Sequence, residues 1–284
     1  MYKNPLVSVI IPTYNEEEEI GHCLKSLNEQ SFQNFEIIII DDGSTDKTCE
    51  IVRKFKNVAL LKGKHKGSGF SRNLGARQAK GKILIFIDAD MTFDKDYIKN
   101  LIKPIFKDKN IIGTTHDYEI ATNTNKTFSA LWGKVRVNKE NASKVVIFRA
   151  ILKDNFLKMG GFDSKYGYAD DQTFWLKYNI MPIVAPKTLC YHRNPDTIKS
   201  TYKQARWIGA SWKERYLVFR IPILKYIAVI CLFLILPISI ILKAIKIKLN
   251  NNFKFIDILK FYSAKFYGYA MGIFRAVFEG KIWK

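Results

Sequence analysis

The N-terminal third of the chain alternates apolar runs with helical patterns, and this alternation restricts the folds that the chain can adopt. The apolar runs lie at residues 7–11 (VSVII), 35–41 (FEIIIID), 58–62 (VALLK) and 82–88 (KILIFID). Helical patterns separate the runs, and Asn15 is expected to cap the first helix. Strands that alternate with helices in this way pair in parallel. The sequence therefore predicts an α/β fold with a doubly wound, mainly parallel sheet.

Acidic residues end two of the predicted strands. Asp41 ends the second run and Asp42 follows it, and Asp88 and Asp90 follow the unbroken apolar stretch 83–87. Alternate strand residues point the same way, so the carboxylates of Asp88 and Asp90 should leave the sheet on one side. Two anions this close favour a cation between them, and oxygen ligands suit Mg²⁺ or Mn²⁺. In doubly wound sheets, ligands bind at these carboxyl ends of the strands.

The alternation loosens after Asp117. Residues 119–144 have the composition of a surface segment or a mobile flap. Beyond them, the pattern predicts strands at 145–149 and 189–193, a helix that starts within 169–178, and a helix over 200–220. The second half of the predicted domain is therefore less regular than the first.

The chain carries a formal net charge of +20, with 46 Lys and Arg residues against 26 Asp and Glu residues. Such a charge attracts polyanions, either nucleic acid or the anionic headgroups of a membrane. The lysines are scattered and no nucleic-acid-binding motif is present. We therefore expect an anionic membrane surface, and no nucleic acid, as the partner of this charge. The four cysteines lie far apart, as in reduced proteins that face the cytosol.

Residues 226–242 form an uncharged apolar stretch that is bounded by Lys225 and Lys243 and interrupted by Pro237. Its length is at the lower limit for a helix that crosses a bilayer. The tail after it carries nine basic and two acidic residues, a net charge of +7, which favours the cytoplasmic side. A re-entrant or interfacial helix, or a hairpin that returns through residues 261–278, would keep this basic tail on the cytoplasmic side. A buried core helix is the alternative without a membrane.

Several longer motifs occur together in one order. They are VSVIIPTYNEEEEIGHCLKSLNEQSFQNFEIIIIDDGSTDKT, GFSRNLGARQAKGKILIFIDADM and GGFDSKYGYADDQTFWLKY. Over about residues 5–215 the chain resembles glycosyltransferase family 2, whose members are inverting enzymes of the GT-A fold. That fold joins a Rossmann-like nucleotide-binding half to an acceptor half. The resemblance implies a catalytic domain at residues 1–215. The apolar stretch and the basic tail predict a membrane-associated helical region at residues 216–284, with the catalytic domain on the cytoplasmic side.

The resemblance also implies roles for individual residues. The nucleotide-sugar-binding residues would be Pro12, Thr13, Tyr14, Asn15, Glu16, Asp41, Arg72, Asp88, Ala89 and Asp90. The ligands of Mn²⁺ or Mg²⁺ would be Asp90, Asp88 and His192. The catalytic residues would be Asp171 and Asp170, and Asp171 matches the base that takes the acceptor hydroxyl's proton. Each residue also has a structural alternative, such as a turn, a surface ion pair or a helix N-terminus.

Two positions depart from the family pattern. Asp170 replaces the usual glutamate, so the choice of base between Asp170 and Asp171 stays open. The stretch YKQARW resembles the Gln-x-x-Arg-Trp motif of processive synthases, but Lys203 occupies the glutamine position. Arg206 and Trp207 remain candidates for the acceptor side, and processive synthesis with export is not expected.

The expected function is transfer of one sugar from a UDP- or GDP-linked nucleotide sugar to a lipid-linked or membrane-proximal glycan acceptor. One alternative is a polyprenyl (dolichyl)-phosphate sugar synthase, whose acceptor is the lipid phosphate itself. A second is a catalytically inactive nucleotide-binding or scaffold protein, against which the intact Asp88, Asp90 and Asp171 argue. A sugar-nucleotide nucleotidyltransferase is disfavoured, because PTYNEEEE is not the glycine-rich, arginine-bearing loop that opens such enzymes.

Overall fold

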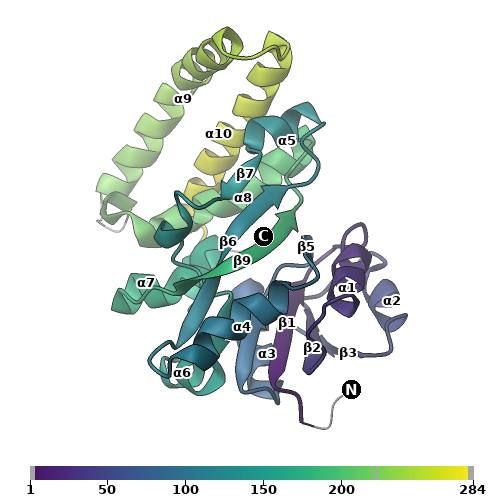
Figure 1. Cartoon of the computed structure of the whole chain (residues 1–284). Coiled ribbons are helices and arrows are strands. Elements are labelled where there is room, and N and C mark those ends of the chain that lie inside the picture. The colour runs from purple at the N-terminus through teal and green to yellow at the C-terminus, as the bar shows by residue number, and fades with distance from the viewer. Residues whose placement is uncertain (1–3, 220, 222, 281–284) are drawn as a thin grey trace. The chain divides into compact units, whose positions relative to one another are not determined.

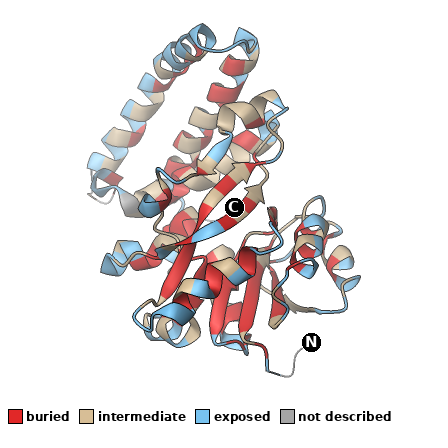
Figure 2. Ribbon diagram, in the orientation of Figure 1, coloured by how far each residue is buried: buried red, intermediate tan, exposed pale blue. Residues whose placement is uncertain are grey.

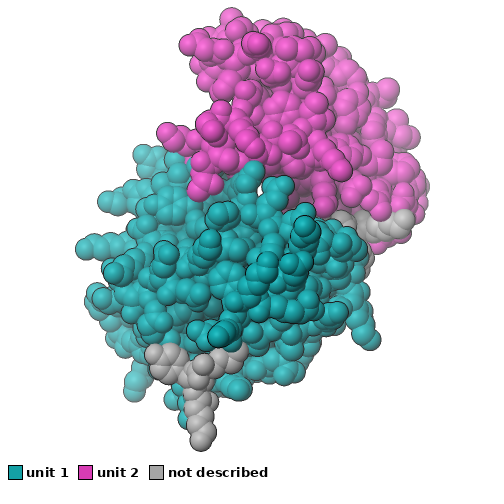
Figure 3. Space-filling view, turned by 90° about the vertical axis from the view of Figure 1, so that its right-hand side faces the viewer, with its two compact units in different colours: residues 1–121, 135–164, 171–193 teal, residues 122–134, 165–170, 194–284 magenta. Residues whose placement is uncertain are grey.

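The computed structural model describes residues 4–219, 221 and 223–280, and the chain divides into two compact units (Figure 3). The first unit comprises residues 1–121, 135–164 and 171–193, and the second comprises residues 122–134, 165–170 and 194–284. The boundary expected at residue 215 separates a catalytic from a membrane-associated region and does not coincide with these units. That functional division stays a prediction.

The first unit is built around one sheet with helices on both faces (Figure 1). Its N-terminal elements alternate, as β1 (Val7–Thr13), α1 (Ile20–Asn28), β2 (Phe35–Asp41), α2 (Thr48–Arg53), β3 (Val58–Lys62), α3 (Ser68–Gln78) and β4 (Ile83–Phe86). The later elements are β5 (Met91–Phe93), α4 (Tyr97–Lys107), β6 (Gly113–Ala121), β7 (Val135–Val137), β8 (Ala150–Leu152), α6 (Lys153–Lys158), α7 (Thr173–Tyr178) and β9 (Ile183–His192). Among the described residues, the strand order is β3-β2-β1-β4-β8-β6-β9-β5, with β7 on β6.

The long ladders of the sheet are parallel, as the sequence predicts. β1 pairs in parallel with β2 and β4, β2 with β3, and β6 with β9. The short strands β5, β7 and β8 pair antiparallel with their neighbours. In the β1–β2 ladder, Thr13 lies opposite Asp41. The α/β fold class is therefore confirmed, and the parallel register aligns the polar ends of β1 and β2 at one edge of the sheet.

The central strands bury both of their faces, which explains why their sequences are apolar without alternation (Figure 2). Odd-numbered residues such as Val9 and Ile39 pack in one core cluster with the apolar faces of α1 and α4. Even-numbered residues such as Ile10 and Phe86 pack in a second cluster with α3 and with Phe156 of α6. Successive side chains point to opposite faces of a strand, so one aliphatic run supplies both clusters.

Two predictions for the second half of the sheet are wrong. The strand expected at residues 145–149 begins only at Ala150, because the apolar run extends to Leu152 and composition does not mark where pairing starts. Residues 119–144, expected as a surface segment or flap, contain the end of β6, the strand β7 and the helix α5 (Thr127–Trp132). Glu119 itself is buried in β6. A charged residue normally indicates an exposed position, so the sequence around Glu119 predicts a surface segment although it forms a buried strand.

The second unit is helical. Its main helices are α5, α8 (Ile198–Arg215), α9 (Leu224–Leu249) and α10 (Phe255–Phe278). Glycines let the backbones of α8 and α10 approach closely. A Cβ atom added at Gly209 would lie 2.2 Å from the carbonyl oxygen of Tyr269, and one added at Gly272 would lie 2.0 Å from that of Arg206. No side chain fits at such distances, so these glycines set the separation of the two helices.

The apolar segment near the C-terminus forms α9 as one continuous helix, and Pro237, expected to interrupt it, lies inside it. Within the part of the chain that the structure describes, α9 is the one helix whose length and composition would allow it to cross a membrane. Many of its apolar side chains are exposed, among them Ile230, Leu234 and Ile238. The helix therefore presents apolar surface along much of its length.

Both ends of α9 nevertheless pack within the second unit. Near its start, Val229 belongs to a buried cluster with Phe219 and with Ile273 of α10. In its C-terminal half, Ile240 and Ala244 belong to a second cluster, which includes residues of α10 and is packed against α5. The helix is thus anchored to its own unit at two places.

Gly272→Ala should destabilise the second unit, because the added Cβ would force the backbones of α8 and α10 apart. Overpacking of this kind costs about 1–3 kcal/mol of the free energy of unfolding. Gly21→Ala in α1 is the matched control, since its Cβ would meet only the Ile51 side chain, at 3.6 Å. That change should be neutral or stabilise the chain by up to about 1 kcal/mol. Denaturant unfolding in detergent measures both, and equal effects would contradict the close-packing account.

Candidate functional site

The loop after β1 is joined to the loop after β2 by hydrogen bonds between backbone and side chains. The Asn15 N–H donates to Ser44 Oγ at 2.9 Å, and Asn15 Oδ1 accepts the Thr45 N–H at 2.8 Å. The Glu16 N–H donates to Thr48 Oγ1 at 2.8 Å. These hydrogen bonds join the two loops along one edge of the sheet, because side-chain oxygens of each loop accept backbone N–H groups of the other.

The capping role expected for Asn15 is wrong. The helix α1 begins at Ile20, and Glu19 precedes it without a capping hydrogen bond from its side chain. Asn15 has a φ of 55°, in the left-handed region that asparagine tolerates better than most residues. Its side chain turns away from the helix to the loop after β2, so it orders the strand edge instead of the helix start.

The other predicted nucleotide-binding residues of the first two strands lie along this edge. Pro12 and Thr13 end β1, and Asp41 ends β2 opposite Thr13. The Asp41 carboxylate is buried and accepts a backbone N–H of the following turn at 3.2 Å. The ring of Tyr14 packs on His65, with the ring centroids 4.4 Å apart. The fold therefore brings these residues together, and their role in binding stays a prediction.

Asp88 follows β4 and is held by two arginines from other parts of the chain. Its Oδ1 atom lies 2.6 Å from Arg72 Nη2 on α3, and its Oδ2 atom lies 3.4 Å from Arg149 Nη1 before β8. Burial raises the pKa of this carboxyl, but Arg72 and Arg149 outweigh it and keep the pKa well below its usual range. Asp88 is therefore an anion with an arginine at each oxygen, and Ala89 beside it is buried in the core.

Asp90 lies beside His192, the last residue of β9. Asp90 Oδ2 and His192 Nε2 are 3.0 Å apart, and the two side chains are 29% and 12% exposed. The pairing of β5 with β9 brings them together, because Met91 lies opposite His192. Burial lowers the pKa of the His192 imidazole, but its carboxylate neighbours outweigh this and raise it to about 9. The fold thus joins two of the three residues expected to share a metal ion.

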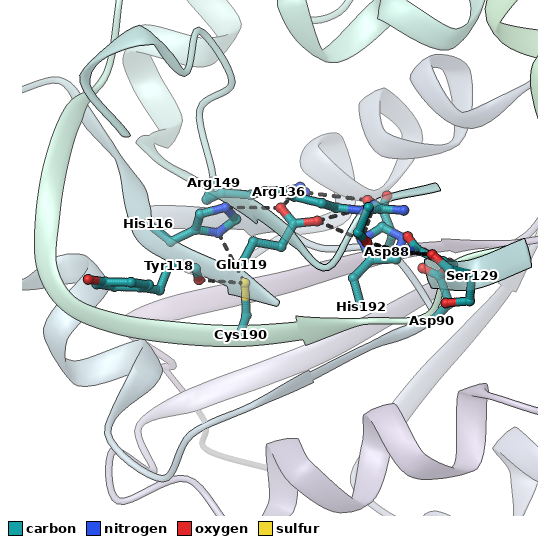
Figure 4. Close-up of polar contacts among 12 residues, drawn as sticks. Asp88, Asp90, His116, Tyr118, Glu119, Ser129, Arg136, Arg149, Cys190 and His192 are labelled. Carbon is teal, nitrogen blue, oxygen red and sulfur yellow. Dashed lines mark hydrogen bonds and ion pairs between the residues drawn. The ribbon is translucent and has the colours of Figure 1, made fainter. Parts of the chain in front are cut away.

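Glu119 of β6 lies at the other edge of the His192 ring and is absent from the residues that the sequence predicts. Its Oε1 atom is 2.9 Å from His192 Nδ1 and 3.2 Å from Arg136 Nη1. Its Oε2 atom is 3.1 Å from His116 Nε2 and 3.9 Å from Arg149 Nη2. Figure 4 shows these contacts. Burial raises the pKa of this carboxyl, but its two histidine partners outweigh it and keep the pKa well below normal.

Glu119, Arg136 and Arg149 carry no motif of their own. Arg149 ends the apolar run VVIFR, and Glu119 lies in DYEIA, where polar and apolar residues alternate. Alternation of this kind predicts a strand, but it also predicts that the polar side chains face solvent, so it gives no indication that Glu119 is buried. Only contacts between distant segments of the chain bring these three residues to the strand edge.

His116, Glu119 and Cys190 form a buried cluster of metal-ligating residue types, in which one donor atom of each residue lies within 4.8 Å of the others. Cys190 Sγ lies 3.3 Å from His116 Nδ1, whereas Glu119 Oε2 lies 3.1 Å from Nε2 of the same ring. The two nitrogens face opposite edges of the imidazole, so a single ion cannot replace both contacts. Burial lowers the pKa of His116 and raises that of the Cys190 thiol. His116 and Cys190 are therefore neutral, hydrogen-bonded side chains beside the Glu119 carboxylate.

Asp170 and Asp171 lie in the 3₁₀-helical segment Ser164–Gln172, which is interrupted at Gly167 with φ 56° and ψ −117°. Asp170 is buried and Asp171 is half-buried. Burial lowers the pKa of Arg149, but nearby anions raise it above its ordinary value, and Asp171 is one of them. Asp171 therefore lies near Arg149 and its ion-pair partners Asp88 and Glu119, which together form a charged cluster in the first unit. The boundary between the units falls between the two residues, and Asp170 belongs to the second unit.

Arg206 and Trp207, predicted for the acceptor side, lie on α8 in the second unit. The Trp207 ring packs edge-on against Tyr168, with the ring centroids 4.9 Å apart. The carbonyl oxygen of Arg206 lies in the close contact with α10 at Gly272. Within the second unit, the Arg-Trp pair thus lies beside the segment that ends at Asp170.

Asp90 and His192 offer donor atoms that fit a divalent cation. Two ligands at right angles on one ion, each about 2.1 Å from it, lie about 3.0 Å apart, and Asp90 Oδ2 and His192 Nε2 have this separation. Carboxylate oxygens suit Mg²⁺ and Mn²⁺, and an imidazole ligand favours the transition ion. Glu119 lies where metal-binding histidines commonly have a carboxylate partner. Asp88, the third predicted ligand, contacts arginines with both oxygens.

The sequence of this chain is similar to those of several glycosyltransferases. An uncharacterized glycosyltransferase of Haemophilus influenzae is 28% identical over 190 residues, which cover 64% of each chain. The poly(ribitol-phosphate) beta-N-acetylglucosaminyltransferase TarS of Staphylococcus aureus is 30% identical over 223 residues, covering 69% of this chain and 37% of TarS. Glycosyltransferase AglE of Haloferax volcanii is 31% identical over 155 residues, covering 50% of this chain and 51% of AglE. The chain spans less than two thirds of the length of each relative.

The fold and a family model agree with these similarities. The crystal structure of S. aureus TarS 1–349 aligns with a TM-score of 0.53 at 24% sequence identity, covering 73% of this chain and 65% of that one. This likeness concerns the fold. The model of glycosyl transferase family 2 matches residues 8–154, which include the strand-end residues Asp41, Asp88 and Asp90. Since the match covers more than half of the chain, the chain belongs to glycosyl transferase family 2.

Proposed function

We propose that this protein transfers one sugar from a nucleotide sugar to a lipid-linked or membrane-proximal glycan acceptor, with Mn²⁺ or Mg²⁺ as cofactor. The observation that carries the proposal is the strand-edge cluster, in which Asp90 and His192 are 3.0 Å apart and two arginines hold Asp88. Membership of glycosyl transferase family 2 supports this class of reaction. TarS has been crystallised in complex with UDP-GlcNAc, which supports a UDP-linked donor.

The residues at the strand edge would bind the donor. Asp90 and His192, with Asp88 beside them, would hold the cation, which when bound stabilises negative charge on the departing nucleoside diphosphate. Arg72 and Arg149 add fixed positive charge at this place. The buried Asp41 carboxylate would accept a hydrogen bond from the nucleobase. The loops after β1 and β2, held together by their hydrogen bonds, would keep that carboxylate in place.

Asp171 is the proposed general base. It would take the proton of the acceptor hydroxyl as that oxygen attacks the anomeric carbon. A base must reach a substrate proton, and the half-buried Asp171 is better suited to this than the buried Asp170. The electrostatic influence of Asp171 on Arg149 also supports a position near the charged cluster.

The second unit would hold the enzyme at the cytoplasmic face of a membrane through α9. Leu234 and Ile238 are 70% and 63% exposed, and soluble surfaces rarely carry long apolar stretches of this kind. Because both ends of α9 pack within its own unit, an interfacial or re-entrant arrangement is favoured over a single span. That arrangement also keeps the basic tail on the cytoplasmic side.

Asp90→Asn should lower sugar transfer by about 100-fold or more, the scale of losing one electrostatic contact to developing charge. EDTA should abolish the activity of the unaltered protein, and added Mn²⁺ should restore it. Release of nucleoside diphosphate from a panel of UDP- and GDP-sugars measures both effects and identifies the donor. Asp108→Asn, at an exposed position after α4, is the matched control and should be fully active. Full activity in chelator would exclude the proposed cofactor.

Asp171→Asn should lower kcat strongly and leave the affinity for the nucleoside diphosphate unchanged, because a base for the acceptor proton acts only in the chemical step. Turnover and isothermal calorimetry with UDP and Mn²⁺ measure the two quantities. Asp170→Asn, one residue away, is the comparison. An inactive Asp170→Asn beside an active Asp171→Asn would assign the base to Asp170.

Replacing both Leu234 and Ile238 with Gln should release the protein from membranes that are washed with high salt. Each apolar side chain that enters lipid contributes on the order of 1 kcal/mol or more to the free energy of membrane binding. The membrane partition coefficient of the double variant should therefore fall about tenfold or more. The matched control replaces Phe106 and Ile183, which are exposed in the first unit, with Gln. Sedimentation of membranes after the wash measures retention. If the unaltered protein washes off in salt alone, insertion of α9 is excluded.

A further inference from the structure

We propose that Glu119 is a positioning residue of the metal site, which fixes the His192 ring so that Nε2 faces Asp90. The inference deepens the proposed function and rests on the cation site that it assigns to Asp90 and His192. Glu119 Oε1 lies 2.9 Å from His192 Nδ1, and Asp90 Oδ2 lies 3.0 Å from Nε2 at the opposite edge of the ring. Glu119 therefore acts through the histidine and not on the cation itself.

The carboxylate of Glu119 is fixed by a buried chain of hydrogen bonds behind it (Figure 4). The Cys190 thiol donates to the Tyr118 carbonyl oxygen at 3.3 Å, and the Tyr97 hydroxyl lies 3.2 Å from His116 Nδ1. With that hydroxyl donating to Nδ1, the neutral His116 ring carries its proton on Nε2. Nε2–H then donates to Glu119 Oε2 at 3.1 Å. The core thus holds Oε2 of Glu119, and Oε1 faces His192 and Arg136.

Glu119 also supports the proton position that coordination needs. A histidine that binds a cation through Nε2 carries its ring proton on Nδ1. Two groups lie at His192 Nδ1, namely Glu119 Oε1 at 2.9 Å and Arg136 Nη1 at 2.7 Å. A guanidinium group has donors only, so Arg136 can pair only with an unprotonated Nδ1, whereas Glu119 can accept a proton from Nδ1. The carboxylate therefore supports the tautomer that leaves Nε2 open toward Asp90.

The test is Mn²⁺ affinity, measured by the EPR signal of free Mn²⁺ during titration of the full chain in detergent. Glu119→Gln removes the charge with little change of shape. Glu119→Asp keeps the charge but draws the carboxylate back by one methylene. Both should lower Mn²⁺ affinity by about 10- to 100-fold, as removal of an outer-shell partner does elsewhere. Pulsed EPR of the bound ion should also show a weaker nitrogen coupling from the histidine ligand in both variants.

Glu36→Gln is the matched control. Glu36 is 7% exposed and Glu119 is 5% exposed. The Glu36 carboxylate accepts hydrogen bonds from Ser8 Oγ at 2.7 Å and from the Lys80 N–H at 2.6 Å, so it serves the sheet interior. Glu36→Gln should therefore lower the melting temperature without changing Mn²⁺ affinity or the nitrogen coupling. A loss of affinity in this variant that equals the loss in Glu119→Gln would overturn the proposal, because general destabilisation would then explain both.

Two reference variants separate failure of this inference from failure of the proposed cation site. His192→Ala and Asp90→Asn should each lower Mn²⁺ affinity. If they do, and both Glu119 variants bind Mn²⁺ like the unaltered protein, then Glu119 is not a positioning residue and the cation site stands. If neither reference variant changes Mn²⁺ affinity, the cation site itself is wrong.

Discussion

Two carboxylates that lie among largely apolar strands, Asp88 and Glu119, determine how the first unit must assemble. An unpaired carboxylate in a protein interior costs several kcal/mol, so the buried Glu119 needs its cationic partners in place. The Asp88 side chain is 29% exposed, so its need for a partner is weaker but of the same kind. Arg72 reaches Asp88 from α3, and Arg149 reaches both carboxylates from the segment before β8. Strand pairing alone would join β4, β6 and β8, but the Arg72–Asp88 pair also fixes where α3 must lie. The contacts of His192 with Asp90 and Glu119 fix the end of β9 in the same way. The chemistry of the strand edge and the architecture of the sheet therefore depend on the same contacts.

The sequence predicts the part of the site that is local and leaves out the part that is not. Asp88 and Asp90 could be found because they directly follow a strand that is buried on both faces and is therefore apolar throughout. Glu119 could not be found in this way. The free-energy cost of burying its charge is offset by partners from distant segments of the chain, and no spacing rule in the sequence relates the positions of these partners. Asn15 shows a related limit. Its residue type fits a helix cap, but a hydrogen bond to the next loop decided its conformation.

The same distinction applies to the fold. The strands β1 to β4 were predictable because each is long enough to show a mainly apolar run between helical patterns. The strands β5, β7 and β8 each have only three residues, too few to show a periodicity, and tertiary pairing alone creates them. The apolar character of α9 is evident from composition. The packing of α9 within its own unit is not evident from composition, because it depends on where α5, α8 and α10 lie.

The charged cluster at the strand edge is close to electrical neutrality before any ligand arrives. Its acidic members are Asp88, Asp90, Glu119 and Asp171, and its basic members are Arg72, Arg136 and Arg149, with His192 among them. A diphosphate added alone would bring uncompensated negative charge into this partly desolvated place, and a divalent cation added alone would bring positive charge. On the proposed function, donor and cation therefore bind cooperatively. Thermodynamic reciprocity then requires each to raise the affinity of the other by the same factor.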